Sequence, residues 1–203
     1  MVERYSRPEM AEKWTQHARY AAWLEVEKAA VKAWAKLGKI PQEDADKIVK
    51  NATFSVERIE EIEAVTKHDL IAFNTSVSES LGEESRWFHY GMTSSDAVDT
   101  GVALQMKASL EIIIADVKML MASIKTRAEE HKMTLMVGRS HGIHGEPITF
   151  GLTLAVWYDE MARHLLNLEQ TMDVICVGQI SGAMGNFAHA PLELEEYAMA
   201  ELG

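Results

Sequence analysis

The sequence predicts an all-α protein, in which a small helical domain over residues 1–92 precedes an incomplete helical bundle over residues 93–203. The chain has four prolines: Pro8, Pro41, Pro147 and Pro191. Each proline opens a stretch with helical periodicity and none interrupts one, as expected of helices that begin at proline. Apolar residues also recur every three or four positions through residues 93–130 and 147–177, which is typical of long amphipathic helices.

Short helices are predicted through the N-terminal region. They cover residues 8–37, with a break near residue 16, and then 41–51, 55–66 and 69–81. Gly38 is a natural stop after the first stretch, because glycine adopts the left-handed conformation that ends many helices. Ser55 is suited to cap the helix over 55–66, since its hydroxyl can accept a hydrogen bond from a first-turn backbone N–H. Residues 83–93 are rich in aromatic side chains and predict a loop.

The two long helices are apolar on more than one face. In the first, a heptad seam follows Met106, Leu110, Ile113, Val117, Leu120 and Ile124. Ile112 and Met119 lie off this seam, as Leu152 and Leu166 do in the second helix. A helix that is apolar nearly all round is buried on several sides, so we expect other subunits to supply part of the packing. The alternative is that short helices of the same chain cover these faces.

The charge, the cysteine content and the distribution of apolar residues exclude several classes of partner and location. The net charge is −11, with 31 acidic against 20 basic residues, which argues against a nucleic-acid polymer or an anionic membrane as partner. The only cysteine, Cys176, excludes an intrachain disulfide, fits a reducing compartment and predicts a small core residue on a helix. The N-terminus lacks the apolar segment of a signal peptide, and no apolar run is long enough to span a membrane. We therefore expect a soluble, cytoplasmic protein.

The stretch from Gly138 to Gly151, GRSHGIHGEPITFG, concentrates titratable side chains between glycines. Glycine costs about 1 kcal/mol relative to alanine at each helical position, so this stretch predicts a constrained loop that carries His141 and His144. Pro147 is suited to the first position of the helix that follows. A loop with histidines on a helical scaffold is a common way to build a site.

Two further segments could carry chemistry. His68 lies in TKHD, between a cation and an anion, and His89 lies in WFHYGMTSSD. Thr93 and Ser94 stand at the predicted start of a long helix, where backbone N–H groups bind anions. The alternative is that one of these hydroxyls only caps the helix, which is worth about 1 kcal/mol.

Two other kinds of site are not favoured. His141, His144 and Glu146 could be read as metal ligands, but glycines and a proline break the helix that would bring them together, and no acidic or cysteine cluster completes the set. The predicted turn-rich loop over residues 178–189, GQISGAMGNFAH, has glycines without the dinucleotide-binding spacing, and no predicted strand precedes it. An acidic helix is predicted after it, from residue 191.

The segments ERYSRPEM, TKHD, HYGMTSSD, GRSHGIHGEP and GQISGAMGNFAH, in this order, resemble the adenylosuccinate lyase branch of the fumarase/aspartase superfamily. The resemblance covers essentially the whole chain and implies the elongated helical bundle of that superfamily, with active sites shared between the subunits of a homotetramer. It implies elimination of fumarate from adenylosuccinate to give AMP, and the parallel cleavage of the succinyl-carboxamide ribotide of purine synthesis. No metal or organic cofactor is implied.

Carried over by position, His141 resembles the general acid and His68 a catalytic residue that assists it. The positions that resemble substrate contacts are Arg4, Tyr5, Lys67, Asp69, His89, Thr93, Ser94 and Ser140. Within this set, the resemblance implies that Arg4 and Tyr5 clamp the nucleotide phosphate, while His89 and the two hydroxyls that follow it contact phosphate or carboxylates. For Glu146 two roles stay open, since it can orient a histidine or cap a helix.

The family's catalytic base is a serine on a glycine-rich loop, and no segment of this chain resembles that loop. We therefore expect an N-terminal portion of such an enzyme, inactive by itself. Two alternatives remain: a non-catalytic helical nucleotide-binding or assembly protein, which is another class of protein, and a related lyase with another succinyl substrate. Competition by AMP distinguishes the second alternative, because a lyase with a non-nucleotide substrate ignores it.

Overall fold

The computed structural model describes residues 3–203, and it is helical apart from one β-hairpin. The described elements are, in order, η1 (Glu3–Tyr5), α1 (Pro8–Glu12), α2 (Gln16–Lys36), α3 (Gln42–Asn51), α4 (Val56–Thr66), α5 (Asp69–Ser78), η2 (Glu83–Trp87), α6 (Ser94–Glu130), β1 (Leu135–Ser140), β2 (Ile143–Thr149), α7 (Phe150–Ile175) and α8 (Leu192–Leu202). The predicted helical class is thus confirmed. None of the described helices is long and apolar enough to cross a membrane.

The residues fall into two compact units. Unit 1 comprises the chain up to Lys107 together with Cys176–Gly203, and unit 2 comprises Ala108–Ile175. Helix α6 therefore begins in unit 1 and ends in unit 2. The domain division expected from the sequence, 1–92 and 93–203, stays a prediction.

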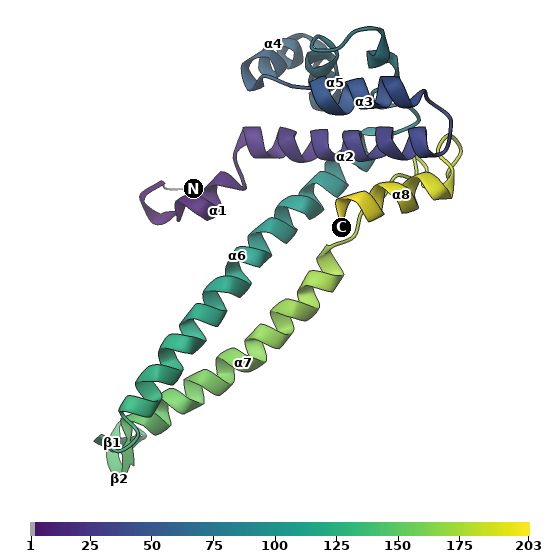
Figure 1. The fold of residues 1–203 in the computed structure, drawn as a ribbon. Helices are drawn as coiled ribbons and strands as arrows, with labels where there is room; N and C mark the ends of the chain where they lie inside the picture. The colour runs from purple at the N-terminus through teal and green to yellow at the C-terminus, as the bar shows by residue number, and fades with distance from the viewer. Residues whose placement is uncertain (1–2) are drawn as a thin grey trace. The chain divides into compact units, whose positions relative to one another are not determined.

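Helix α2 is the centre of unit 1. Figure 1 shows it between α8 on one side and the group α3, α4 and α5 on the other. It buries aromatic side chains against these neighbours: the Tyr20 ring stacks on Phe73 with centroids 5.9 Å apart, and Trp23 meets Phe73 edge-on at 5.5 Å. Such pairs add to the stabilisation that burial of apolar area already gives.

The helix boundaries in unit 1 follow local capping chemistry. The predicted break near residue 16 is confirmed, because α1 ends at Glu12 and the Thr15 hydroxyl accepts a hydrogen bond from Ala18 N, 3.0 Å away, at the start of α2. Ser55 likewise caps α4 by accepting from Arg58 N at 3.3 Å. The predicted loop over residues 83–93 is wrong at its start, where η2 forms a short 3₁₀ helix.

Unit 2 is an antiparallel helix pair closed by the hairpin, with the later turns of α6 beside α7 (Figure 1). Lys118 and Glu169 form an ion pair between the helices, with N and O atoms 3.3 Å apart. At the hairpin end, Gly151 N donates to His131 O at 2.9 Å. A Cβ on Gly151 would lie 2.6 Å from Ala128 O, so only glycine permits this approach of the two helices.

The prediction of a loop over residues 138–151 is wrong, since these residues contribute to the antiparallel strands β1 and β2. Pro147 does not open a helix but lies in β2 opposite Val137, next to the shift in register between Val137 and Arg139. Strand proline is tolerated at such irregularities, because the ladder there does not need its N–H. Helix α7 begins at Phe150, and the Thr149 hydroxyl caps it by accepting from Leu152 N at 3.2 Å.

Candidate active-site elements

His89 is held in an unusual conformation by a buried carboxylate. Its φ is +60°, a value that few non-glycine residues adopt. Glu27 of α2 is fully buried, and its two oxygens bind the same residue: Oε2 accepts from His89 N at 3.1 Å, and Oε1 lies 2.6 Å from Nδ1. Because a carboxylate can only accept, Nδ1 of His89 carries a proton.

The residues that follow His89 are fixed by α2 as well. Trp34 Nε1 donates to Tyr90 O at 2.8 Å. Gly91 has φ +74°, and a Cβ there would lie 3.1 Å from His189 O and 3.0 Å from the Trp34 ring. The segment between η2 and α6 is therefore a tightly packed loop, with its conformation set by α2 and by the loop after α7.

The N-terminus of α6 is organised by Asp96, another fully buried carboxylate. Asp96 Oδ2 accepts from Thr93 N at 2.9 Å, and the same carboxylate accepts from Ser181 N at 3.1 Å and from Gly182 N at 3.2 Å. The bond to Thr93 N is the half of a capping box that the third residue of the helix supplies. The helix start that carries Ser94 is thus tied to the glycine-rich loop over residues 178–189.

That loop has further anchors to its own unit. Thr100 Oγ1 accepts from Gln179 N at 3.0 Å and donates to Gln179 O at 3.1 Å. Ile180 N donates to Glu195 Oε2 of α8 at 2.8 Å. The predicted turn-rich character is confirmed, because the loop has no regular structure and has positive φ angles at Gly182 and Gly185.

The segment TKHD forms the junction between α4 and α5. Lys67 ends α4 in the left-handed conformation, with φ 55°, and is exposed. His68 caps α5 through its ring, since Nδ1 accepts from Ile71 N at 3.4 Å. A neutral His68 that accepts at Nδ1 carries its proton on Nε2, and it can therefore donate from that nitrogen. Asp69 accepts from Arg19 Nη2 at 3.4 Å.

The other predicted site residues are exposed. Arg4 and Tyr5 lie in η1, with the guanidinium 4.8 Å from the centre of the Tyr5 ring. Ser140 and His141 lie at the tip of the hairpin, where His141 and Gly142 have φ 55° and 76°. Two consecutive positive φ angles are a feature of the type I′ turn that joins antiparallel strands. His141 belongs to unit 2, whereas His68, His89 and Thr93 belong to unit 1.

The surroundings of His89 displace its pKa. Burial of its ring lowers the pKa, while the hydrogen bond that the ring donates to Glu27 and the negative charges of Glu27 and Asp96 raise it, and the net result is a pKa above the ordinary value. The imidazolium form of His89 is thus favoured where an anionic ligand would need it.

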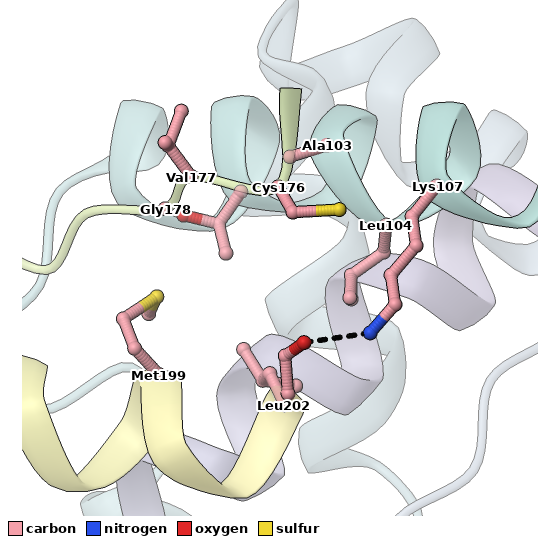
Figure 2. Close-up of a pocket in the computed structure, with 10 residues that line it drawn as sticks. Ala103, Leu104, Lys107, Cys176, Val177, Gly178, Met199 and Leu202 are labelled. Carbon is pink, nitrogen blue, oxygen red and sulfur yellow. Dashed lines mark hydrogen bonds between the residues drawn. The ribbon is translucent and has the colours of Figure 1, made fainter. Parts of the chain in front are cut away.

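Among residues 3–203, no three histidine, cysteine, aspartate or glutamate side chains form a group that could hold a metal ion. Figure 2 shows a small apolar cavity in unit 1 that Leu104, Cys176 and Met199 help to line, with Lys107 Nζ bound to Gly203 O at 2.7 Å. Its volume is about 40 Å³, far below the several hundred Å³ typical of a pocket for a small-molecule ligand. Cys176 follows α7 and is partly exposed, so its expected place on a helix is wrong.

Sequence reasoning missed Glu27 and Asp96, the two carboxylates that position this site. Glu27 stands four residues after Trp23 and seven before Trp34, so an acidic residue occupies the apolar face of α2. A charged residue on an apolar helix face was the available signal for a buried polar contact, because a buried charge almost always has a partner.

A sequence profile described as Lyase matches residues 3–203. The chain belongs to this lyase family. It is 61% identical over 203 residues to an adenylosuccinate lyase of Helicobacter pylori and 50% identical to that of Bacillus subtilis, matching all of this chain in both cases and 46% and 47% of the relatives. A crystal structure described as fumarate lyase, from Mesorhizobium sp. BNC1, aligns with a TM-score of 0.89 at 28% identity, covering 95% of this chain and 47% of that one. This member of the lyase family thus spans about half the length of the relatives it matches.

Proposed function

We propose that the protein acts as an adenylosuccinate lyase in the cytoplasm, eliminating fumarate from adenylosuccinate to give AMP and from the succinyl-carboxamide ribotide of purine biosynthesis. The observation that carries this proposal is the identity of 61% and 50% to adenylosuccinate lyases across all 203 residues. The matched region covers the segments in which the predicted site residues lie.

The reaction needs a base, an acid and donors for negative charge, and this chain can supply the acid and the donors. A base removes a proton from the carbon beside a carboxylate of the succinyl group, the carbon–nitrogen bond breaks, and the electron pair stays on nitrogen. An acid then protonates that nitrogen, and AMP and fumarate leave. Negative charge develops beside the carboxylate, so preorganised donors stabilise the transition state, and histidine suits the acid near neutral pH.

We assign the acid to His141 and an assisting role to His68. The position of His141 on a two-residue hairpin turn fixes its backbone and exposes its side chain, which suits a group that must meet a substrate. His68 uses Nδ1 to cap α5, so its Nε2–H can donate to the substrate or to another catalytic group. We assign no base among these residues.

We assign anion contacts to the start of α6 and its neighbours. Thr93 and Ser94 stand at the N-terminus of α6, where the helix dipole also favours negative charge. His89 precedes them in the chain, and the charge of Asp96 in the first turn of α6 acts on its ring. Arg4 and Tyr5 would clamp the nucleotide phosphate, because a guanidinium binds two oxygens at once. Lys67, Asp69 and Ser140 complete the proposed substrate contacts.

We further propose that the protein works as a homotetramer. The helix pair of unit 2 exposes several large apolar side chains: Met119, Leu120, Leu152, Val156, Trp157 and Leu166, with exposed fractions between 48% and 61%. Isolated monomers rarely expose so many on one helical element. Sedimentation of the complete gene product that contains these residues tests this: Leu166→Glu is expected to dissociate it, while Lys50→Glu on the exposed side of α3 leaves it assembled.

The decisive experiment follows the loss of adenylosuccinate absorbance with the complete gene product. We expect the wild type to release AMP and fumarate, and His141→Asn to lower kcat by about 10²–10⁴-fold, the usual contribution of a general acid. Asparagine tolerates the positive φ of this turn, so the fold is kept. His144→Asn, in the same exposed hairpin, is the matched control and is expected to stay active. A wild type that neither cleaves adenylosuccinate nor binds AMP would contradict the proposal.

A further inference from the structure

We propose that Glu27 is a positioning residue that holds His89 as an oriented imidazolium for an anionic group of the substrate, a phosphate or a carboxylate. This inference rests on the proposed function for the identity of the substrate. The link between Glu27 and His89 rests on their geometry alone.

The first step is that Glu27 controls two features of one residue. Its Oε2 holds the backbone N–H of His89 at 3.1 Å, and its Oε1 holds the ring at 2.6 Å. The first contact stabilises the left-handed backbone, with φ 60°, and the second fixes the ring rotamer and its proton on Nδ1. The other ring nitrogen, Nε2, is then the one that can meet a ligand. A carboxylate that fixes the tautomer and orientation of a histidine is a known catalytic device.

The second step concerns burial. Glu27 has no exposed surface, whereas the His89 side chain keeps 22% of its own. A fully buried carboxylate costs stability unless a charged or hydrogen-bonded partner compensates it, and His89 supplies that partner with both its backbone N–H and its ring. The carboxylate is thus placed where its function is to hold a histidine that solvent and ligand can reach.

The third step concerns the charge that the ligand meets. The charged groups acting on the ring are Glu27 from α2 and Asp96 from α6. The Asp96 carboxylate accepts hydrogen bonds from three backbone N–H groups. Glu27 is therefore the carboxylate that contacts the His89 ring directly. The negative charges of Glu27 and Asp96 together favour the cationic form of the ring. Helix α6 begins only five residues after His89. An anion at that terminus would meet an imidazolium as well as backbone N–H groups.

The experiment compares Glu27→Gln with wild type in the complete gene product. Glutamine keeps the size and can still accept from His89 N, but its amide N–H₂ would face Nδ1, and this reverses the tautomer and removes the charge. The matched control is Glu25→Gln, on the same helix, where the carboxylate is exposed. Glu27→Asp keeps the charge with a shorter reach and is expected to restore part of the lost affinity.

Two measurements test separately whether Glu27 controls His89 and which substrate group His89 binds. The first is the His89 pKa from NMR of labelled histidine rings, assigned with His89→Asn, which needs no ligand. We expect it to fall in Glu27→Gln and to stay unchanged in Glu25→Gln. The second is inhibition by AMP and by fumarate, the two products that carry phosphate and carboxylates respectively. The product whose inhibition becomes weaker in Glu27→Gln identifies the group that His89 binds. We expect its affinity to fall by about tenfold or more, as for loss of a charge-assisted hydrogen bond.

The outcomes are distinct from those of the proposed function. A lower His89 pKa with weaker binding of either product supports the role of Glu27. An unchanged pKa, or unchanged binding of both products in folded Glu27→Gln, overturns it. A wild type that cleaves no adenylosuccinate would refute the lyase proposal, and the NMR titration would still decide whether Glu27 sets the state of His89.

Discussion

Asp96 in the first turn of α6 binds the backbone N–H of Gly182, 86 residues further along the chain, with both carboxylate oxygens within 3.3 Å. The same side chain closes the cap of α6 at Thr93. One buried carboxylate therefore sets the position of a helix terminus relative to a glycine-rich loop. Both segments are among those that carry the resemblance to adenylosuccinate lyases, so their relative position matters for any ligand at this terminus.

We predict that Asp96→Ala releases the loop over residues 178–189. The substitution leaves the buried Ser181 N–H and the partly buried Thr93 and Gly182 N–H groups without this acceptor, at about 1–3 kcal/mol for a buried unsatisfied group. Protection of the Ser181 and Gly182 amides against hydrogen exchange should fall by about 30-fold or more, which corresponds to roughly 2 kcal/mol. Asp99→Ala is the control, because Asp99 is exposed and makes one long bond to the same loop, 3.3 Å from Gln179 Nε2. Equal protection in the two variants would show that Asp96 does not hold the loop.

We predict that two glycines of the hairpin differ in their tolerance of alanine. A Cβ on Gly138 would lie 2.6 Å from Glu146 O, so backbone must move and the hairpin should lose about 2–3 kcal/mol. Gly142 has open space around it but a φ of 76°, and an L-residue in that region costs about 1–2 kcal/mol. Hydrogen exchange of the β1 and β2 amides compares the variants. A Gly142 variant as poorly protected as the Gly138 variant would contradict this ranking.

The long helices were predictable because their signal is local. Apolar residues three and four apart, such as Leu110, Ile113 and Val117, lie on one face of a helix whatever the rest of the chain does. The hairpin was missed because Gly138, Gly145 and Pro147 lie within its strands, and glycine and proline weaken the sequence pattern of a strand. Its turn also has histidine and glycine where asparagine and glycine would be the strong signal, and the glycines argued equally well for a loop.

The candidate site was predictable in part for a similar reason. Motifs such as TKHD and HYGMTSSD mark the candidate segments, and the structure gives His68 and His89 defined hydrogen-bond partners. The partner of His89 lies elsewhere in the sequence, since Glu27 is 62 residues from His89. Local sequence reasoning has no means of pairing them, and only the packing of α2 against the loop after η2 reveals the contact.

We predict that α7 depends on Thr149 and not on Pro147 for its start. Thr149→Ala removes the hydroxyl that accepts from Leu152 N and should destabilise the first turn by about 1 kcal/mol, the usual value of an N-cap. Thr149→Ser keeps the acceptor and is the matched control. Pro147→Ala should leave the first turn of α7 as protected as in wild type. Amide exchange at residues 150–153 measures both effects. Loss of protection in Pro147→Ala would contradict this prediction and would support the helix start at Pro147 that the sequence suggested.

We predict a pH dependence of stability that arises from His89. The folded-state pKa of His89 is raised above its ordinary value of 6.5, with burial acting against the shift and Glu27 driving it. A group with a raised folded pKa binds its proton more tightly in the native state, so protonation favours folding. This contribution is fully present below about pH 6.5, the unfolded value, and is lost as pH rises through the folded value.

Melting temperatures across pH 5.5–9 measure this contribution when wild type is compared with His89→Asn, a residue that tolerates a positive φ. The difference between the two proteins should be largest in acid and should shrink as pH rises above about 6.5. Titrations of groups that do not contact His89 are common to both proteins and cancel in the difference, whereas Glu27 loses its ring partner in the variant. A difference that grew with pH would mean that His89 is held neutral in the folded state, and Glu27 would then serve the backbone conformation rather than the charge of the ring.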